Sequence, residues 1–77
     1  MNKKRRERLQ AAVAHLEMAS EIIEEVRDDE QESMDNMPEN LQSSDRYSEM
    51  EEAVDCLEDA VSLLSDATEQ VKTACEK

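Results

Sequence analysis

The 77-residue chain contains no glycine, tryptophan or phenylalanine, and only one proline and one tyrosine. β-Sandwiches and barrels need turn residues and aromatic or β-branched strands, so these absences exclude them. Dinucleotide-binding α/β folds need glycine-rich loops and a longer chain. The longest apolar run covers only residues 11–14, whereas a membrane span needs about 20 apolar residues, and no secretory leader is expected. The composition therefore favours one small all-α domain.

Cationic residues are also scarce, since nine Lys and Arg stand against 21 Asp and Glu, a net charge of −12. Seventeen of the acids lie in residues 17–59, opposed only by Arg27 and Arg46. Folded in half as helix, this segment spans about 32 Å. The segment therefore carries one net negative charge per about 2.1 Å of its length, which is close to the one charge per ~1.7 Å of axis in duplex DNA. Such a field suits either a solvated surface or a face that binds a basic partner, and it opposes direct binding to nucleic acid.

Residues 3–8 carry the opposite charge, a net +4. Cations are disfavoured at a helix N-terminus. We therefore expect this segment either to fray or to contact acidic groups of a neighbouring chain or partner.

The two cysteines, Cys56 and Cys75, are separated by 19 residues. On one helix this places them about 28 Å apart, whereas a disulfide needs Cα atoms within about 7 Å. An intramolecular bridge is therefore excluded. Free thiols fit a reducing cytoplasm, and we expect both cysteines to act as small apolar side chains.

Apolar residues recur at helical spacing over residues 9–26 and again over residues 50–71. Pro38 disfavours α geometry at the residue before it, so the first helix should end by about residue 36. The pattern predicts a helix over about 4–36, a connection over about 37–44 and a helix over about 45–75. Ser43, Ser44 and Asp45 are candidate N-caps, and Ser48 begins an alternative capping box.

Within the connection, Pro38 is expected to begin a single helical turn. Leu41 is expected to fold back over the end of the hairpin.

The second helix has a heptad repeat in which large residues and alanines alternate, Met50, Leu57, Leu64 and Val71 against Ala53, Ala60, Ala67 and Ala74. The first helix repeats the scheme with Leu9, Leu16 and Ile23 against Ala12, Ala19 and Val26. Alanines let helices approach closely, so we expect an antiparallel two-helix hairpin with large residues over alanines. The predicted helix–helix seam comprises Leu9, Leu16, Ile23, Leu57, Ala60 and Leu64.

The apolar stripes are wider than one partner helix can cover, since Ile22 adjoins Ile23 and Val61 lies near Leu63 and Leu64. The simplest completion is a homodimer that forms a four-helix bundle. Docking on a different protein is the alternative.

Acidic residues step at intervals of three and four along both helices, which gathers them into stripes. We predict a partner-binding acidic face made of Glu17, Glu21, Glu24, Glu25, Asp28, Asp29, Glu32, Glu51, Asp55, Glu58 and Asp59.

Patterns that carry catalysis or bind metals are missing. His15, the only histidine, is expected to be half-buried and to ligate nothing. Di-iron bundles need Glu-x-x-His pairs, and the calcium-loop pattern needs a glycine. A hairpin also lacks a cleft deep enough to exclude water. We therefore expect no enzyme activity, no cofactor and no metal.

Three segments, residues 1–10, 22–31 and 36–42, resemble a group of short acidic proteins from phages and mobile elements of Gram-positive bacteria. The resemblance covers most of the chain and implies a phage or prophage context, with no assigned chemistry. Small acidic helical phage proteins are often inhibitors of host defence, including anti-CRISPR and anti-restriction proteins that imitate DNA. This analogy of type carries over no residue role.

The sequence thus predicts a non-catalytic phage-type protein in the cytoplasm of an infected or lysogenic bacterium. Its acidic helical face would occupy a basic, nucleic-acid-binding surface of a host defence protein. The alternative is a structural or assembly module that acts only through helix–helix association.

Overall fold

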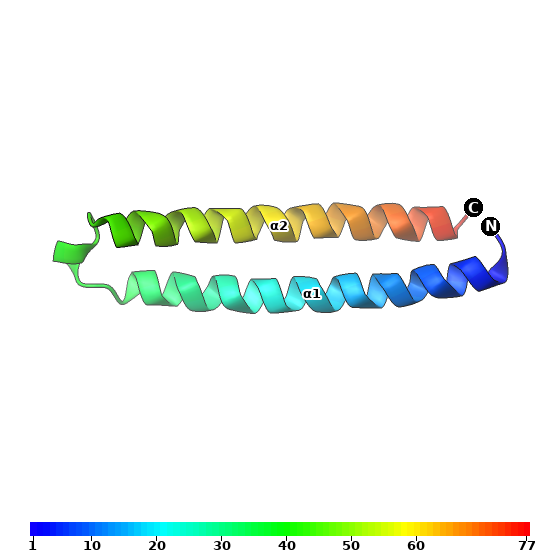
Figure 1. Cartoon of the computed structure of the whole chain (residues 1–77), viewed down its shortest axis with the longest axis horizontal. Coiled ribbons are helices and arrows are strands. Elements are labelled where there is room, and N and C mark those ends of the chain that lie inside the picture. The colour runs from blue at the N-terminus through cyan, green and yellow to red at the C-terminus, as the bar shows by residue number, and fades with distance from the viewer.

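The computed structural model describes all 77 residues and contains two long helices joined by a short connection. Helix α1 spans Lys3–Asp35, the 3-10 turn η1 spans Glu39–Leu41, and helix α2 spans Asp45–Cys75. The helices run antiparallel, side by side, in a rod 59 Å long with both chain ends at one end (Figure 1). The prediction of an all-α antiparallel hairpin is confirmed, and each helix limit lies within one residue of the expected position.

Each helix begins at a residue whose side chain caps it. The Oδ1 of Asn2 accepts a hydrogen bond from the backbone N–H of Arg5 at 2.8 Å. The Oγ of Ser44 accepts one from the N–H of Tyr47 at 3.3 Å. Both oxygens satisfy backbone donors that a first helical turn leaves without partners. Ser44 is therefore the N-cap among the candidates, and the capping box at Ser48 lies inside α2, where it is not used.

The connection contains the helical turn expected after Pro38, because η1 follows that residue directly. The Oγ of Ser44 donates a hydrogen bond to the carbonyl of Leu41 at 2.6 Å and so ties η1 to the start of α2. The side chain of Leu41 is 45% exposed. The expectation that it covers the end of the hairpin is therefore wrong.

Residues shielded from solvent alternate at intervals of three and four along both helices, which defines heptad positions a and d. In α1 and just beyond it, position a holds Arg6, Val13, Ser20, Arg27 and Met34, and position d holds Leu9, Leu16, Ile23, Glu30 and Met37. In α2, position a holds Tyr47, Val54, Val61, Thr68 and Cys75, and position d holds Met50, Leu57, Leu64 and Val71. The contact between the helices is thus one continuous heptad seam.

The predicted alternation of large residues with alanines describes this seam only in part, since Ala12, Ala19, Ala53, Ala60 and Ala74 are half-buried along its edge. The leucines and isoleucine of the predicted set (Leu9, Leu16, Ile23, Leu57 and Leu64) occupy d positions, but Ala60 occupies the neighbouring g position. Val54 and Val61, one residue after an alanine in each case, fill position a instead. Val26 and Ala67 are exposed, so their expected place in the seam is wrong. Burying valine removes more apolar area from water than burying alanine, and this sets the rotation of α2.

The basic segment forms the first turns of α1. Arg6 lies at an a position, and its Nε donates a hydrogen bond to the carbonyl of Cys75 at 3.0 Å. That carbonyl belongs to the last turn of α2, where unpaired carbonyls and the helix dipole favour a cation. Arg6 therefore closes the open end of the hairpin.

Only Met34 and Val54 are buried in the isolated hairpin, with exposed fractions of 3% and 4%. Every other seam residue retains part of its accessible surface. Two helices can shield one stripe of each partner and no more. The packing that stabilises this chain is therefore thin and linear.

Candidate functional site

Arg27 interrupts the apolar seam at position a, in the third of α1 nearer η1. Its Nη2 lies 2.8 Å from the Oδ1 of Asp28, and its Nη1 lies 3.3 Å from the Oε1 of Glu58 on the other helix. The carboxylate of Asp28 is the main cause that raises the pKa of Arg27 above its ordinary value. The Nε of Arg27 is shielded from solvent and has no hydrogen-bond partner. Arg27 thus joins two carboxylates across the hairpin while remaining charged.

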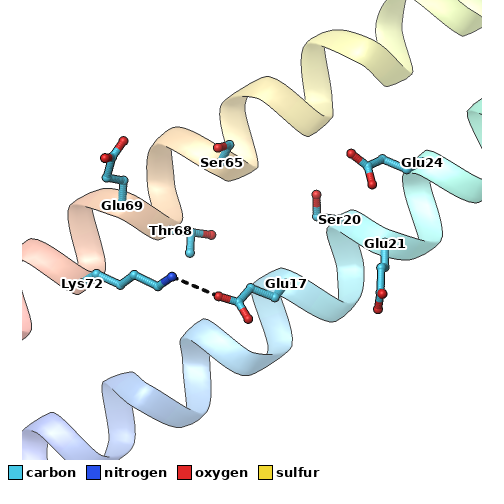
Figure 2. A pocket seen from close by; sticks show the side chains of 8 residues that line it. All are labelled: Glu17, Ser20, Glu21, Glu24, Ser65, Thr68, Glu69 and Lys72. Carbon is cyan, nitrogen blue, oxygen red and sulfur yellow. Dashed lines mark ion pairs between the residues drawn. The ribbon is translucent and has the colours of Figure 1, made fainter.

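A second cross-helix ion pair lies nearer the chain ends. The Nζ of Lys72 is 3.2 Å from the Oε1 of Glu17, and Figure 2 shows the two side chains meeting between the helices. Both residues occupy e positions, which flank position a on the same side of an antiparallel pair. The e positions of α1 and α2 therefore face each other on one side of the hairpin.

A shallow groove of 410 Å³ runs along that side and is lined only by polar side chains: Glu17, Ser20, Glu21, Glu24, Ser65, Thr68, Glu69 and Lys72. In Figure 2, Glu21 and Glu69 point outward from the groove, whereas Ser20 points toward the opposite helix. Four carboxylates and one ammonium group leave the groove with an excess of negative charge. Its chemistry suits the cationic side chains of a protein rather than an apolar small molecule.

Seven residues of the predicted acidic face fall on this side, at e and b positions: Glu17, Glu21, Glu24 and Asp28 of α1, and Glu51, Asp55 and Glu58 of α2. We call these seven the carboxylate side. All seven are exposed. The heptad register and the two cross-helix ion pairs bring them together from both helices.

The other four residues of the predicted acidic face lie elsewhere. Glu25, Glu32 and Asp59 occupy f positions on the outer surfaces of their helices, and Asp29 occupies a c position on the side opposite the groove. The single acidic face expected from spacing alone is therefore too broad, because acids at neighbouring heptad positions point in different directions.

Few of the acidic groups are neutralised within the molecule. Four carboxylates, those of Glu7, Glu17, Asp28 and Glu58, have a cation within 4.0 Å. The other seventeen of the 21 acidic side chains have none. The fold therefore presents most of its negative charge to its surroundings.

The g and c positions of both helices form a second surface, on the side away from the groove. Between the charged ends of the rod these positions hold Ala12, His15, Ala19, Ile22, Val26, Ala53, Cys56, Ala60, Leu63, Ala67, Gln70 and Ala74. We call this set the alanine face. Asp29 also occupies a c position, and apart from it and His15 this surface carries no acidic or basic residue between the ends of the rod, although 39% of the chain is charged. Leu63 is 68% exposed and Ile22 is 55% exposed.

Two predictions about side chains on the alanine face are wrong. His15 and Cys56 occupy c positions and are exposed, whereas His15 was expected to be half-buried and Cys56 to fill apolar space. Cys75 is half-buried at position a, and both thiols are free. The width of the apolar stripes predicted uncovered surface at Ile22 and Leu63, and both residues are exposed.

No group of three or more His, Cys, Asp or Glu side chains is arranged to hold a metal ion. Neither helix contains a stretch with the length and apolar character that crossing a bilayer requires. Comparisons with protein-family models, with curated proteins and with solved structures find no match to this chain. The functional argument therefore rests on the two surfaces of the hairpin.

Proposed function

We propose that this chain is a non-catalytic binding protein whose carboxylate side occupies a basic, nucleic-acid-binding surface of another protein. The observation that carries the proposal is the gathering of seven exposed carboxylates from two helices along one side of a rod. A rod bearing negative charge at short intervals offers the electrostatic features by which basic proteins bind the duplex backbone. Complementary charge of this kind steers association and fixes the bound orientation.

The geometry of the groove supports this reading. Two helices hold the carboxylates on rigid elements, and Arg27 and Lys72 link those helices across the carboxylate side. Little ordering of the acidic groups would then be needed on binding, which lowers the entropic cost. We place this activity in the cytoplasm of an infected or lysogenic bacterium, with a host defence protein as partner. The phage context that the resemblance implies, and the analogy with anti-CRISPR proteins, support this placement.

The alanine face favours a second candidate function, that of a structural or assembly module acting through helix–helix association. Its larger apolar residues Ile22, Val26 and Leu63 are exposed. It holds a single carboxylate, Asp29, and it is separate from the carboxylate side. We propose that the working unit is a homodimer, a four-helix bundle in which the carboxylate sides stay open.

A capture experiment tests the main proposal. The immobilised protein is exposed to bacterial lysate, and bound proteins are eluted either with salt or with duplex DNA. Occupation of a nucleic-acid-binding surface predicts that one basic protein is retained and that both eluents release it, since DNA competes for the surface and salt screens it. A retained protein that resists both eluents would contradict the proposal and favour the assembly module.

A further inference from the structure

The alanine face ends in two recesses of opposite charge. At the open end of the hairpin, a recess of 430 Å³ is lined by Met1, Arg5, Arg8, Leu9 and Ala12. At the end near η1, a recess of 260 Å³ is lined by Glu30, Arg46, Glu49 and Met50. Both sets come from c, d and g positions, so both recesses lie on the same side of the rod. A strip with one carboxylate, Asp29, thus separates an end with two arginines from an end that holds two glutamates and Arg46.

The isolated hairpin also exposes more surface than its mass requires. Its accessible surface is 5965 Å², whereas a compact monomer of 8.8 kDa exposes about 4,800 Å². The excess is about 1,200 Å². A stable protein–protein interface removes about 600–1,000 Å² from each partner. One further copy of the chain can therefore cover the excess.

We infer that the alanine face is the dimer interface, and that a second copy of the chain docks on it in the antiparallel orientation. The two copies are related by a two-fold axis perpendicular to the rod, so the open end of one copy lies beside the η1 end of the other. This rotation lays the arginine recess of each copy over the glutamate recess of the other. Alanines at the g positions let the two hairpins approach closely, while Ile22 and Leu63 lose their contact with water. The inference rests on the proposed homodimer and specifies its face and orientation.

Charge decides between this arrangement and the parallel one. In a parallel dimer, the two arginine recesses would lie at one end of the bundle, and the two recesses that hold Glu30 and Glu49 would lie together at the other end. Like charges in contact disfavour an interface, whereas opposite charges fix its register. The same rotation leaves the carboxylate sides on the two outer surfaces of the bundle.

Spin labels on Cys75 measure the orientation directly. In a Cys56→Ser background, labels at Cys75 sit near one end of each hairpin. Antiparallel pairing about the middle of α2 predicts a label separation of about 45 Å, from 15 residues of helix on each side of the axis. A parallel dimer would give a separation under about 20 Å, set by neighbouring helix spacing. The short separation would overturn the orientation.

A pair of adjacent substitutions tests the face. Leu63→Glu places a charge on the alanine face, and Ser62→Glu places the same charge on the other side of α2. By sedimentation equilibrium we expect Leu63→Glu to weaken the dimer by about 30-fold or more, and Ser62→Glu to weaken it by less than about threefold. Equal effects would show that a different face pairs and would overturn the inference while leaving the homodimer standing.

A wild-type mass of 8.8 kDa at about 100 μM would overturn both the homodimer and the inference. If Leu63→Glu lowers the helix content, the spin-label separation still decides the orientation, because that experiment keeps the native Leu63. None of these measurements depends on the carboxylate side, so the proposed binding function is tested separately.

Discussion

Arg27 shows how a single charged residue links the two helices of this hairpin. It takes a seam position that Val13 and Met34 fill in other turns of the same helix, and it binds carboxylates on both helices. Its alkyl stem covers apolar surface while the guanidinium reaches outward. A charged residue at a core heptad position specifies register more than it adds stability.

Two substitutions at Arg27 separate packing from charge. Arg27→Met keeps a long apolar stem and removes the buried Nε that lacks a partner, so we expect the melting temperature to be unchanged or higher. Arg27→Ala removes the stem as well, so its melting temperature should fall. Thermal unfolding followed by circular dichroism measures both. An equal fall for both variants would show that the ion pairs, and not the stem, stabilise the hairpin.

The two methionines with extreme exposure give a matched test of the small core. Met34 is 3% exposed and Met18 is 59% exposed on the outer surface of α1. Met34→Ala should lower the free energy of unfolding by about 2–5 kcal/mol, and Met18→Ala by less than about 0.5 kcal/mol. Urea titration measures both values. Similar losses at the two positions would contradict the assigned seam.

At the scale of the element, each helix depends on its cap. Ser44 caps α2 and also holds the carbonyl of Leu41, whereas the neighbouring Ser43 is exposed. Ser44→Ala should reduce stability by about 0.5–2 kcal/mol, and Ser43→Ala should have little effect. Denaturant unfolding of the two variants provides the comparison. A loss confined to Ser43→Ala would move the start of α2 by one residue.

Sequence reasoning predicted the elements because their ends carry strong local signals. Pro38 stops α1, and Ser44 starts α2. The seam was harder, because Ala53 and Val54 both repeat at intervals of seven. Local spacing cannot say which of two adjacent stripes faces the partner helix. The larger area buried by valine decides it, and that is a tertiary effect.

The same uncertainty in rotation limited the candidate site. Glu21 and Glu25 are one helical turn apart and seemed to share a face by spacing alone. With the seam at positions a and d, Glu21 lies on the carboxylate side and Glu25 lies on the outer surface. The number of acidic residues could therefore be read from the sequence. Which of them lie on the carboxylate side could be decided only once the heptad register of the two packed helices was known.

At the scale of the whole molecule, self-repulsion should govern stability. Seventeen carboxylates have no cationic partner, and the net charge is −12. Raising the ionic strength from about 0.01 M to about 1 M shortens the screening length from about 30 Å to about 3 Å. The melting temperature of the free protein should therefore rise with sodium chloride. A fall would mean that the ion pairs of Arg27 and Lys72 outweigh the repulsion.

The most direct test of the central claim compares two triple variants that change the net charge equally. One is Glu21→Gln, Glu24→Gln and Asp55→Asn, on the carboxylate side. The other is Glu25→Gln, Glu32→Gln and Asp59→Asn, on the outer surfaces. None of these six carboxylates lies within 4.0 Å of a cation, so neither triple breaks an ion pair of the hairpin.

Isothermal titration of each triple variant into the basic protein retained in the capture experiment measures the two affinities. The account predicts that the carboxylate-side variant binds at least about tenfold more weakly than the outer-surface variant, which corresponds to about 1.4 kcal/mol. Both variants should be at least as stable as the wild type, because each removes like charge. Equal affinities for the two variants would contradict the claim that the carboxylate side is the binding surface.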